Sequence, residues 1–112
     1  MTKKEAIKIF EEKKVRTAWD DETEEWYFSV IDVIEILTDS SNPRRYWSDL
    51  KSKLAEEGSQ LYAKIVQLKM LSPDGKMRLT DVMTTEQMFR LIQSILSPKA
   101  EPFKLWMAQT AK

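Results

Sequence analysis

The run Ser72-Pro73-Asp74-Gly75 constrains the fold of this chain more than any other short segment. Proline presets one turn torsion and glycine accepts a positive φ, so this run favours a tight reversal of the chain. Beyond the run, Met77 and Leu79 alternate with polar residues, as the side chains of a half-buried strand do. We therefore expect residues 65–71 and 76–82 to form an antiparallel β-hairpin.

The N-terminal part of the chain predicts three further strands in a meander. Apolar or β-favouring side chains alternate with other residues in segments 7–9 and 15–19, which a polar turn over 11–14 separates. After an acidic hairpin tip at residues 20–25, Trp26-Tyr27-Phe28 returns as the third strand. A small antiparallel sheet is therefore expected before the first helix.

Four helices are predicted from capping residues and apolar spacing. Ser29 and the acid three positions later form an N-cap pattern, and Asn42-Pro43 caps and opens a second helix. Thr84 or Thr85 caps a third helix, and the last helix has Pro102 in its first turn. The apolar residues at helical spacing are Val30, Val33, Ile34, Leu37, Tyr46 or Trp47, Leu50, Leu54, Met88, Ile92, Ile95, Leu96, Phe103, Trp106 and Met107.

The order β-β-β-α-α-β-β-α-α predicts one α+β domain over residues 1–112. Small antiparallel sheets, the N-terminal meander and the later hairpin, would pack with four helices. A length of 112 residues and a hydrophobic share of 42% suffice for one core. No apolar run is long enough to span a membrane. The chain stops at Lys112 without a helix C-cap, so we expect an N-terminal fragment of a longer protein.

The amino-acid inventory excludes most kinds of catalysis. The 112 residues include no histidine and no cysteine, so no Ser-His or Cys-His nucleophile and no ordinary zinc site can form. We expect no enzyme activity, no cofactor and no metal. The alternative is a magnesium site built from carboxylates such as Asp32, Asp39 and Asp81. The missing cysteines and the lack of a signal peptide fit a cytoplasmic protein.

Charge is balanced overall but unevenly distributed. The net charge is zero, yet residues 1–63 carry four more acidic than basic residues, and residues 64–112 carry four more basic than acidic ones. Five acids cluster between Asp20 and Glu25, where they keep a hairpin tip solvated. A metal loop there is the alternative, but the tip lacks the glycine and ligand spacing of a calcium site. The remaining surface is mildly basic and can face phosphates locally.

The helix that opens at Asn42 is the first candidate contact surface for DNA. Arg44 and Arg45 lie in its first turn, and Lys51 follows on a face that apolar residues do not occupy. Arginine can hold a phosphate or a guanine edge with two hydrogen bonds, and a helix N-terminus adds backbone donors. The alternative is that these are ordinary solvated charges on an amphipathic helix.

The predicted hairpin is a second candidate, because Lys69, Lys76 and Arg78 can form a basic patch on it. A β-ribbon can enter a groove of DNA, and a basic loop can hold the DNA backbone. The segment Lys13-Lys14-Val15-Arg16 is a weaker candidate, because the adjacent Glu11-Glu12 offsets its field.

The tryptophans allow a further hypothesis, stacking on nucleic-acid bases. Core packing explains Trp19, Trp26 and Trp106 better, because they fall at inward strand positions or on an apolar helical stripe. Tyr46 or Trp47 is the best candidate for stacking, since basic residues adjoin both.

Six segments carry a family resemblance. They are IKIF at 7–10, VRT at 15–17, WYFSVIDV at 26–33, NPR at 42–44, TEQMFRLI at 85–92 and SPKAEPFKLW at 97–106. Together they resemble the BRO-type N-terminal domain, which occurs in phage antirepressors and in related proteins of large DNA viruses. The resemblance covers residues 6–112. Two departures, TDSS at 38–41 and the lack of a Ser-Glu-Gly lead before residue 85, are more similar to a bacterial subgroup that includes DNA-damage-inducible D-type proteins.

The resemblance implies a non-enzymatic, DNA-associated regulator with a separate C-terminal domain. Our primary hypothesis is a DNA-binding or antirepressor module. Its expected DNA contacts are Arg44, Arg45, Lys51, Lys69, Lys76 and Arg78. The rival hypothesis is a protein-interaction module that binds a phage repressor or a DNA-repair protein, which the zero net charge and the acidic tip would suit. A homo-oligomer is compatible with both.

Overall fold

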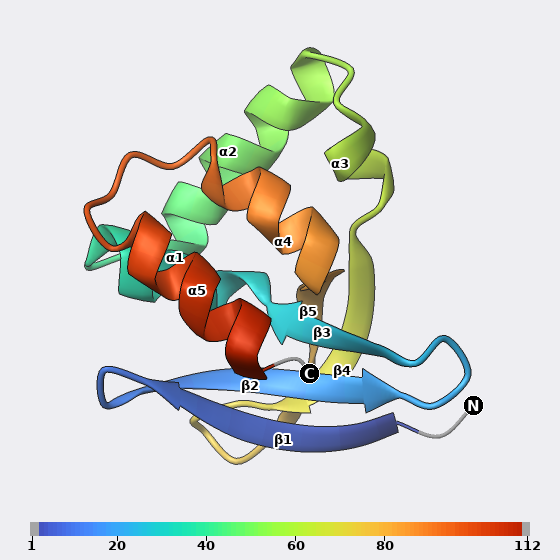
Figure 1. Ribbon diagram of the computed structural model, residues 1–112. Coiled ribbons are helices and arrows are strands. Elements are labelled where there is room, and N and C mark those ends of the chain that lie inside the picture. Colours follow the sequence, from blue (N-terminus) through green and yellow to red (C-terminus); the bar gives the residue numbers. More distant parts are fainter. Residues whose placement is uncertain (1–2, 111–112) are drawn as a thin grey trace.

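The structure is a computed structural model that describes the backbone of residues 3–110 and the side chains of residues 6–110. The predicted α+β class is confirmed, with five antiparallel strands and five helices in this part of the chain. The strands form one sheet in the order β1-β2-β3-β5-β4 (Figure 1). Their bounds are β1 Lys3–Phe10, β2 Lys13–Asp20, β3 Glu25–Ser29, β4 Val66–Leu71 and β5 Met77–Thr84.

The predicted meander and hairpin are parts of one sheet, which corrects the expectation of separate small sheets. β3 pairs with β5, and Phe28 lies opposite Met83 in this register. Both side chains are fully buried beneath the helices, so the pairing brings them into the same core. Such a pairing between distant segments leaves no local trace in the sequence.

Residues 3–110 form five helices where four are predicted. They are α1 Val30–Thr38, α2 Pro43–Glu56, α3 Gln60–Ala63, α4 Thr85–Ile92 and α5 Ala100–Thr110. The predicted N-caps Ser29, Asn42 and Thr84 are confirmed, each accepting a hydrogen bond from a backbone N–H of the first turn. The additional helix, α3, is a single turn without a buried residue, so it has no apolar periodicity to predict it.

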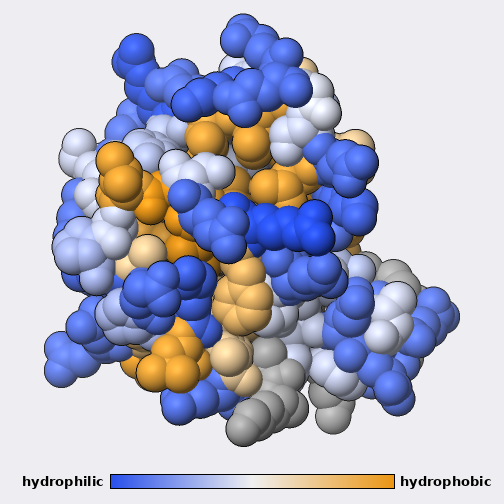
Figure 2. Space-filling view, turned by 45° about the horizontal axis from the view of Figure 1, so that its top comes forward, coloured by the Kyte–Doolittle hydropathy of each residue, from blue (hydrophilic) through white to orange (hydrophobic). Residues whose placement is uncertain are grey.

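The end of α4 differs from its prediction. The helix stops at Ile92, and short-range bonds from Ser94 N–H to the Leu91 carbonyl and from Ile95 N–H to the Ile92 carbonyl follow it. Ile95 therefore stays buried, whereas the side chain of Leu96 is fully exposed. Figure 2 shows that hydrophobic atoms interrupt the mainly hydrophilic surface over the helices.

The helices lie on one side of the sheet and build the main core there (Figure 1). α5 lies against β1, because the ring of Phe10 packs at 5.0 Å from Phe103 and at 5.6 Å from Trp106. A second small core lies on the other face of the sheet, where Met70 of β4 packs with residues of β2 and β5. In Figure 1, β4 accordingly passes behind β2. α2 packs against α1, and hydrogen bonds to Asp81 of β5 hold it beside the β4–β5 hairpin.

The predicted inward positions of Trp19 and Trp26 are confirmed only in part. The two rings pack against each other at 5.3 Å, and both side chains are half-buried. Lys8 places its ammonium 4.2 Å from the centre of the Trp26 ring, so a cation covers that ring. The Trp19 contact and the Lys8 ammonium therefore make Trp26 a poor platform for base stacking.

The turn between β1 and β2 holds its backbone in a disfavoured region. It consists of Glu11 and Glu12 alone, shorter than predicted, with φ angles of 47° and 68°. Positive φ at both central residues is typical of a type I′ hairpin turn, for which Asn-Gly is the preferred pair. A left-handed conformation costs an ordinary L residue about 1–2 kcal/mol.

Replacing this pair in the variant Glu11→Asn/Glu12→Gly should raise the free energy of unfolding by about 1–2 kcal/mol, because the new residues accept positive φ. Urea unfolding followed by tryptophan fluorescence measures the change. The control Glu11→Gln/Glu12→Gln removes the same charges without relieving the backbone, and should change stability by less than about 0.5 kcal/mol. Equal effects of the two variants would contradict the backbone explanation.

Candidate nucleic-acid interface

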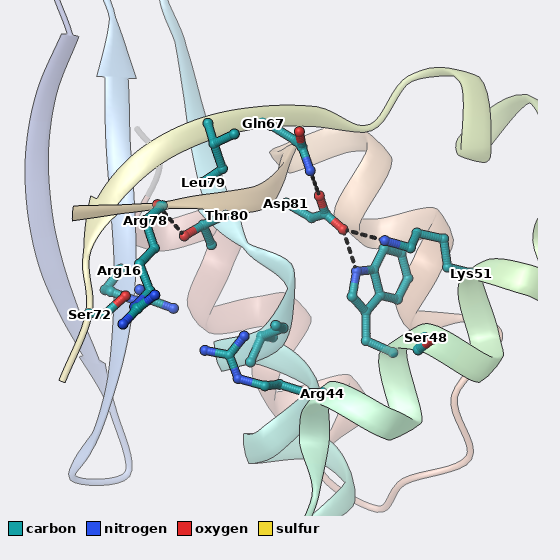
Figure 3. Close-up of a pocket in the computed structure, with 12 residues that line it drawn as sticks. Arg16, Arg44, Ser48, Lys51, Gln67, Ser72, Arg78, Leu79, Thr80 and Asp81 are labelled. Atoms are coloured by element: carbon teal, nitrogen blue, oxygen red, sulfur yellow. Dashed lines mark hydrogen bonds and ion pairs between the residues drawn. The ribbon is translucent and has the colours of Figure 1, made fainter. Parts of the chain in front are cut away.

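A cleft of about 390 Å³ lies between α2 and the β4–β5 hairpin, and we name it the α2–β5 cleft (Figure 3). α2 and β5 supply much of its wall, and single residues of β2, α1, β4 and the β4–β5 turn complete it. Its most informative lining residues are Arg16, Arg44, Trp47, Lys51, Arg78 and Asp81. Figure 3 shows the carboxylate of Asp81 with its hydrogen-bond donors at one end of the cleft and arginines toward the other.

The carboxylate of Asp81 organises the first end. Its side chain is only 8% exposed, and its Oδ2 accepts hydrogen bonds from Trp47 Nε1 at 2.7 Å and Lys51 Nζ at 2.9 Å. Its Oδ1 accepts a third from Gln67 Nε2 at 3.0 Å. Burial raises the pKa of Asp81, but the hydrogen bonds from Trp47, Gln67 and Lys51 and the Lys51 charge outweigh it and hold the pKa below its usual range.

Trp47 is therefore a core residue. Its side chain is 3% exposed and its indole N–H is bound to Asp81, so the stacking hypothesis does not hold for it. Tyr46, the other stacking candidate, is exposed. Because Trp47 and Lys51 stand one helical turn apart and donate to the same oxygen, they fix the position of α2 against the hairpin.

Arginines from three elements line the cleft toward its second end (Figure 3). Arg16 of β2 is held by Asp32, with Nε 2.8 Å from Oδ2 and Nη2 3.0 Å from Oδ1, and its Nη1 donates to the Leu71 carbonyl at 3.2 Å. Arg78 of β5 donates to Asp74 in the hairpin turn. Arg44 of α2 is exposed and makes no side-chain hydrogen bond or ion pair with any residue in the described part of the chain.

The structure brings together three of the six residues predicted to contact DNA. Arg44, Lys51 and Arg78 line the α2–β5 cleft. The other three are exposed but do not line it, and they are Arg45, Lys69 and Lys76. Their proposed contacts with DNA would therefore have to be made outside the cleft.

Sequence reasoning underrated Arg16 and did not connect Asp81 with α2. The adjacent glutamates make Arg16 a weak candidate in the sequence, whereas in the structure its partner is Asp32 of α1. The signal for Arg16 was its polar position between inward-facing neighbours on a strand. No comparable signal linked Asp81 to Lys51, since they belong to elements far apart in the chain.

The alternative of a magnesium site is contradicted for the described residues. Asp32 pairs with Arg16, Asp81 with Lys51, and Asp39 with Lys13 and Lys99. Among residues 6–110 no three acidic side chains gather in a way that could hold a metal ion.

None of the helices that the structure describes has the length and apolar character needed to cross a membrane.

Changing Asp81→Asn should lower the free energy of unfolding at pH 7 by about 2–3 kcal/mol, because Lys51 and Trp47 lose a buried anionic acceptor. The lowered pKa means that the carboxylate stabilises the fold above its unfolded value of about 3.9. That contribution is lost as the pH falls through the lower pKa of the folded state. Urea unfolding of both proteins at neutral and acidic pH should therefore show their difference shrinking in acid.

The exposed carboxylate of Asp21 supplies the control, because Asp21→Asn removes a charge without removing a buried acceptor. Its effect should stay within about 0.5 kcal/mol. A difference between the unmodified chain and Asp81→Asn that does not change with pH would contradict the role of the ionised carboxylate.

Comparisons with known proteins bear on this site through the family. Searches of the curated proteins and of the solved structures each found no match. The family model of the BRO family, N-terminal domain, matches residues 14–112, which include both α2 and the β4–β5 hairpin. The match covers most of the chain and agrees with the resemblance seen in the sequence. The chain therefore belongs to the BRO family and carries its N-terminal domain.

Proposed function

We propose that the chain is a non-enzymatic, DNA-binding regulatory module of a prophage antirepressor-like protein, acting in the cytoplasm and contacting DNA at the α2–β5 cleft. The observation that carries the proposal is that Arg16, Arg44 and Arg78, from three separate elements, line one cleft. Membership of the BRO family supports it. Arginine suits this task because its guanidinium donates two parallel hydrogen bonds to a phosphate.

The four cations of the cleft differ in how freely they can reach a ligand. Arg44 is exposed, has no side-chain partner among residues 6–110, and lies in the first turn of α2, where the helix dipole also favours an anion. Arg78 is half-exposed, whereas Lys51 and Arg16 are held by buried or half-buried carboxylates. We therefore assign direct phosphate contact to Arg44 and Arg78, and a supporting positive field to Arg16 and Lys51. Arg45, Lys69 and Lys76 would make outer contacts.

Removing one phosphate contact gives a specific prediction. Arg44→Ala should weaken DNA binding at low salt by about tenfold and reduce the slope of log affinity against log salt by about 0.9 for duplex DNA. Fluorescence anisotropy with labelled duplex and single-stranded oligonucleotides, over a series of salt concentrations, measures both quantities.

Arg45→Ala is the matched control for this experiment. It removes the same charge from the same helical turn but from outside the cleft. Its loss of affinity should be smaller, about threefold or less, because Arg45 does not line the cleft with Arg16 and Arg78. Equal losses in the two variants would reject the cleft as the contact surface. No DNA binding by the unmodified chain at low salt would reject the DNA-binding function itself.

A protein-interaction module that binds a phage repressor or a DNA-repair protein is the second candidate, and the edge of the sheet favours it. β1 pairs with β2 alone among the described strands. Its Ile7 and Ile9 side chains are 58% and 60% exposed. An open strand edge with apolar side chains readily pairs with another extended segment, including a second copy of the same chain.

Self-association tests this edge without an identified partner. If β1 is an interaction edge, the apparent mass in sedimentation velocity should rise with concentration. The variant Ile7→Lys/Ile9→Lys should stay monomeric, because charge opposes pairing at an edge. Leu105→Lys changes an equally exposed residue of α5 and should behave like the unmodified chain. A monomer at every concentration would contradict self-pairing through β1.

A further inference from the structure

Each cation of the α2–β5 cleft except Arg44 is held by its own carboxylate. Asp32 holds Arg16, Asp81 holds Lys51, and Asp74 holds Arg78. A ligand phosphate at the cleft must therefore compete with carboxylates of the chain itself. Which of the three gives way is determined by how deeply each is built into the fold.

Two of these carboxylates are fixed. Asp81 is 8% exposed and accepts three hydrogen bonds. Asp32 is 14% exposed, and besides the Arg16 side chain it accepts the Arg16 backbone N–H at 2.9 Å. Breaking either pair would leave a charge poorly solvated inside the protein. Neither aspartate can leave its cation without disturbing α1 or α2.

Asp74 is bound differently. It lies in the hairpin turn before β5, its side chain is 45% exposed, and the side chain of Arg78 is 50% exposed. Both groups can be solvated by water when they separate, so exposed pairs of this kind contribute little to stability. The Asp74 carboxylate keeps a second, local role, because its Oδ1 accepts the Lys76 backbone N–H at 3.1 Å. Arg78 can therefore exchange its partner without unfolding the turn.

We propose that the arginine end of the cleft is a phosphate-binding subsite, and that Asp74 is an internal anion which occupies Arg78 until a ligand phosphate replaces it. The incoming group must offer non-bridging phosphate oxygens to Arg44 and Arg78 together. Figure 3 shows the guanidinium of Arg44 extending from α2 toward the end of the cleft where Arg16 and Arg78 lie. A phosphodiester of a nucleic-acid backbone and a free phosphate group share this chemistry. Assigning the ligand as DNA rests on the proposed function above.

The variant Asp74→Asn tests this subsite with little structural change. Asparagine keeps an Oδ1 that can accept from Lys76, and Pro-Asn-Gly is a favourable turn sequence. Without its competing carboxylate Arg78 is free, so affinity for a labelled oligonucleotide at low salt should rise about three- to tenfold. The slope of log affinity against log salt should become steeper, by an amount that corresponds to up to about one additional released counterion.

A double-mutant cycle separates displacement from a general effect of charge. In an Arg78→Ala background, Asp74→Asn should no longer increase affinity beyond the effect of the remote control Asp21→Asn. Asp21 is an exposed acid in the turn between β2 and β3, so its change alters net charge by the same amount. An equal gain from Asp74→Asn with and without Arg78 would overturn the proposal.

Inorganic phosphate distinguishes a failure of the subsite from a failure of DNA binding. Titration of the Asp74→Asn variant with phosphate, followed by NMR of the arginine Nε–H signals, should shift Arg44 and Arg78 together. Phosphate binding without oligonucleotide binding would retain the subsite and reject DNA as its ligand. Oligonucleotide binding that is unaffected by Asp74→Asn would retain DNA binding and reject the subsite. Binding of neither probe would reject both.

Discussion

The arrangement of the cleft depends above all on the hydrogen bonds of the Asp81 carboxylate. Its three donors come from α2 and β4, while Asp81 itself lies on β5. A buried carboxylate without such donors would be strongly destabilising, so the helix must pack at the angle that delivers Trp47 and Lys51 to one oxygen. That angle also determines where the first turn of α2, with Arg44, stands relative to the hairpin. A packing interaction at one end of the cleft thereby positions Arg44 at the other.

The Arg16–Asp32 pair follows the same principle in another place. β3 ends at Ser29, where α1 begins, so the backbone N–H of Arg16 has no strand partner there. Asp32 supplies the missing acceptor and binds the guanidinium of the same residue. A carboxylate therefore completes the secondary structure and orients a cation at once. Through such pairs a chain of zero net charge can still present arginines in a cleft.

The parts of the fold that depend on neighbouring residues could be predicted, whereas those that join distant segments could not. The caps Ser29, Asn42 and Thr84 act on backbone groups within three residues, so their side chains and the apolar spacing behind them revealed the helices. The pairing of β3 with β5 buries Phe28 beside Met83. The alternation of apolar and polar side chains within each strand is equally compatible with separate sheets, so it does not predict this pairing. Fold class followed from local pattern, and sheet topology required tertiary packing.

The same division explains what the sequence revealed about the cleft. Arginine at a helix N-terminus and basic residues on a hairpin are local features, and Arg44 and Arg78 were found from them. Whether a cation is free depends instead on a carboxylate from another element, which separates Arg44 from Lys51 on the same helix. A count of charges along the sequence does not distinguish these two residues, although Arg44 is exposed and Lys51 is bound to Asp81. For an anionic ligand the relevant quantity is therefore how readily each internal carboxylate releases its cation. Asp74 should release its cation most readily, because it is the most exposed of the three carboxylates.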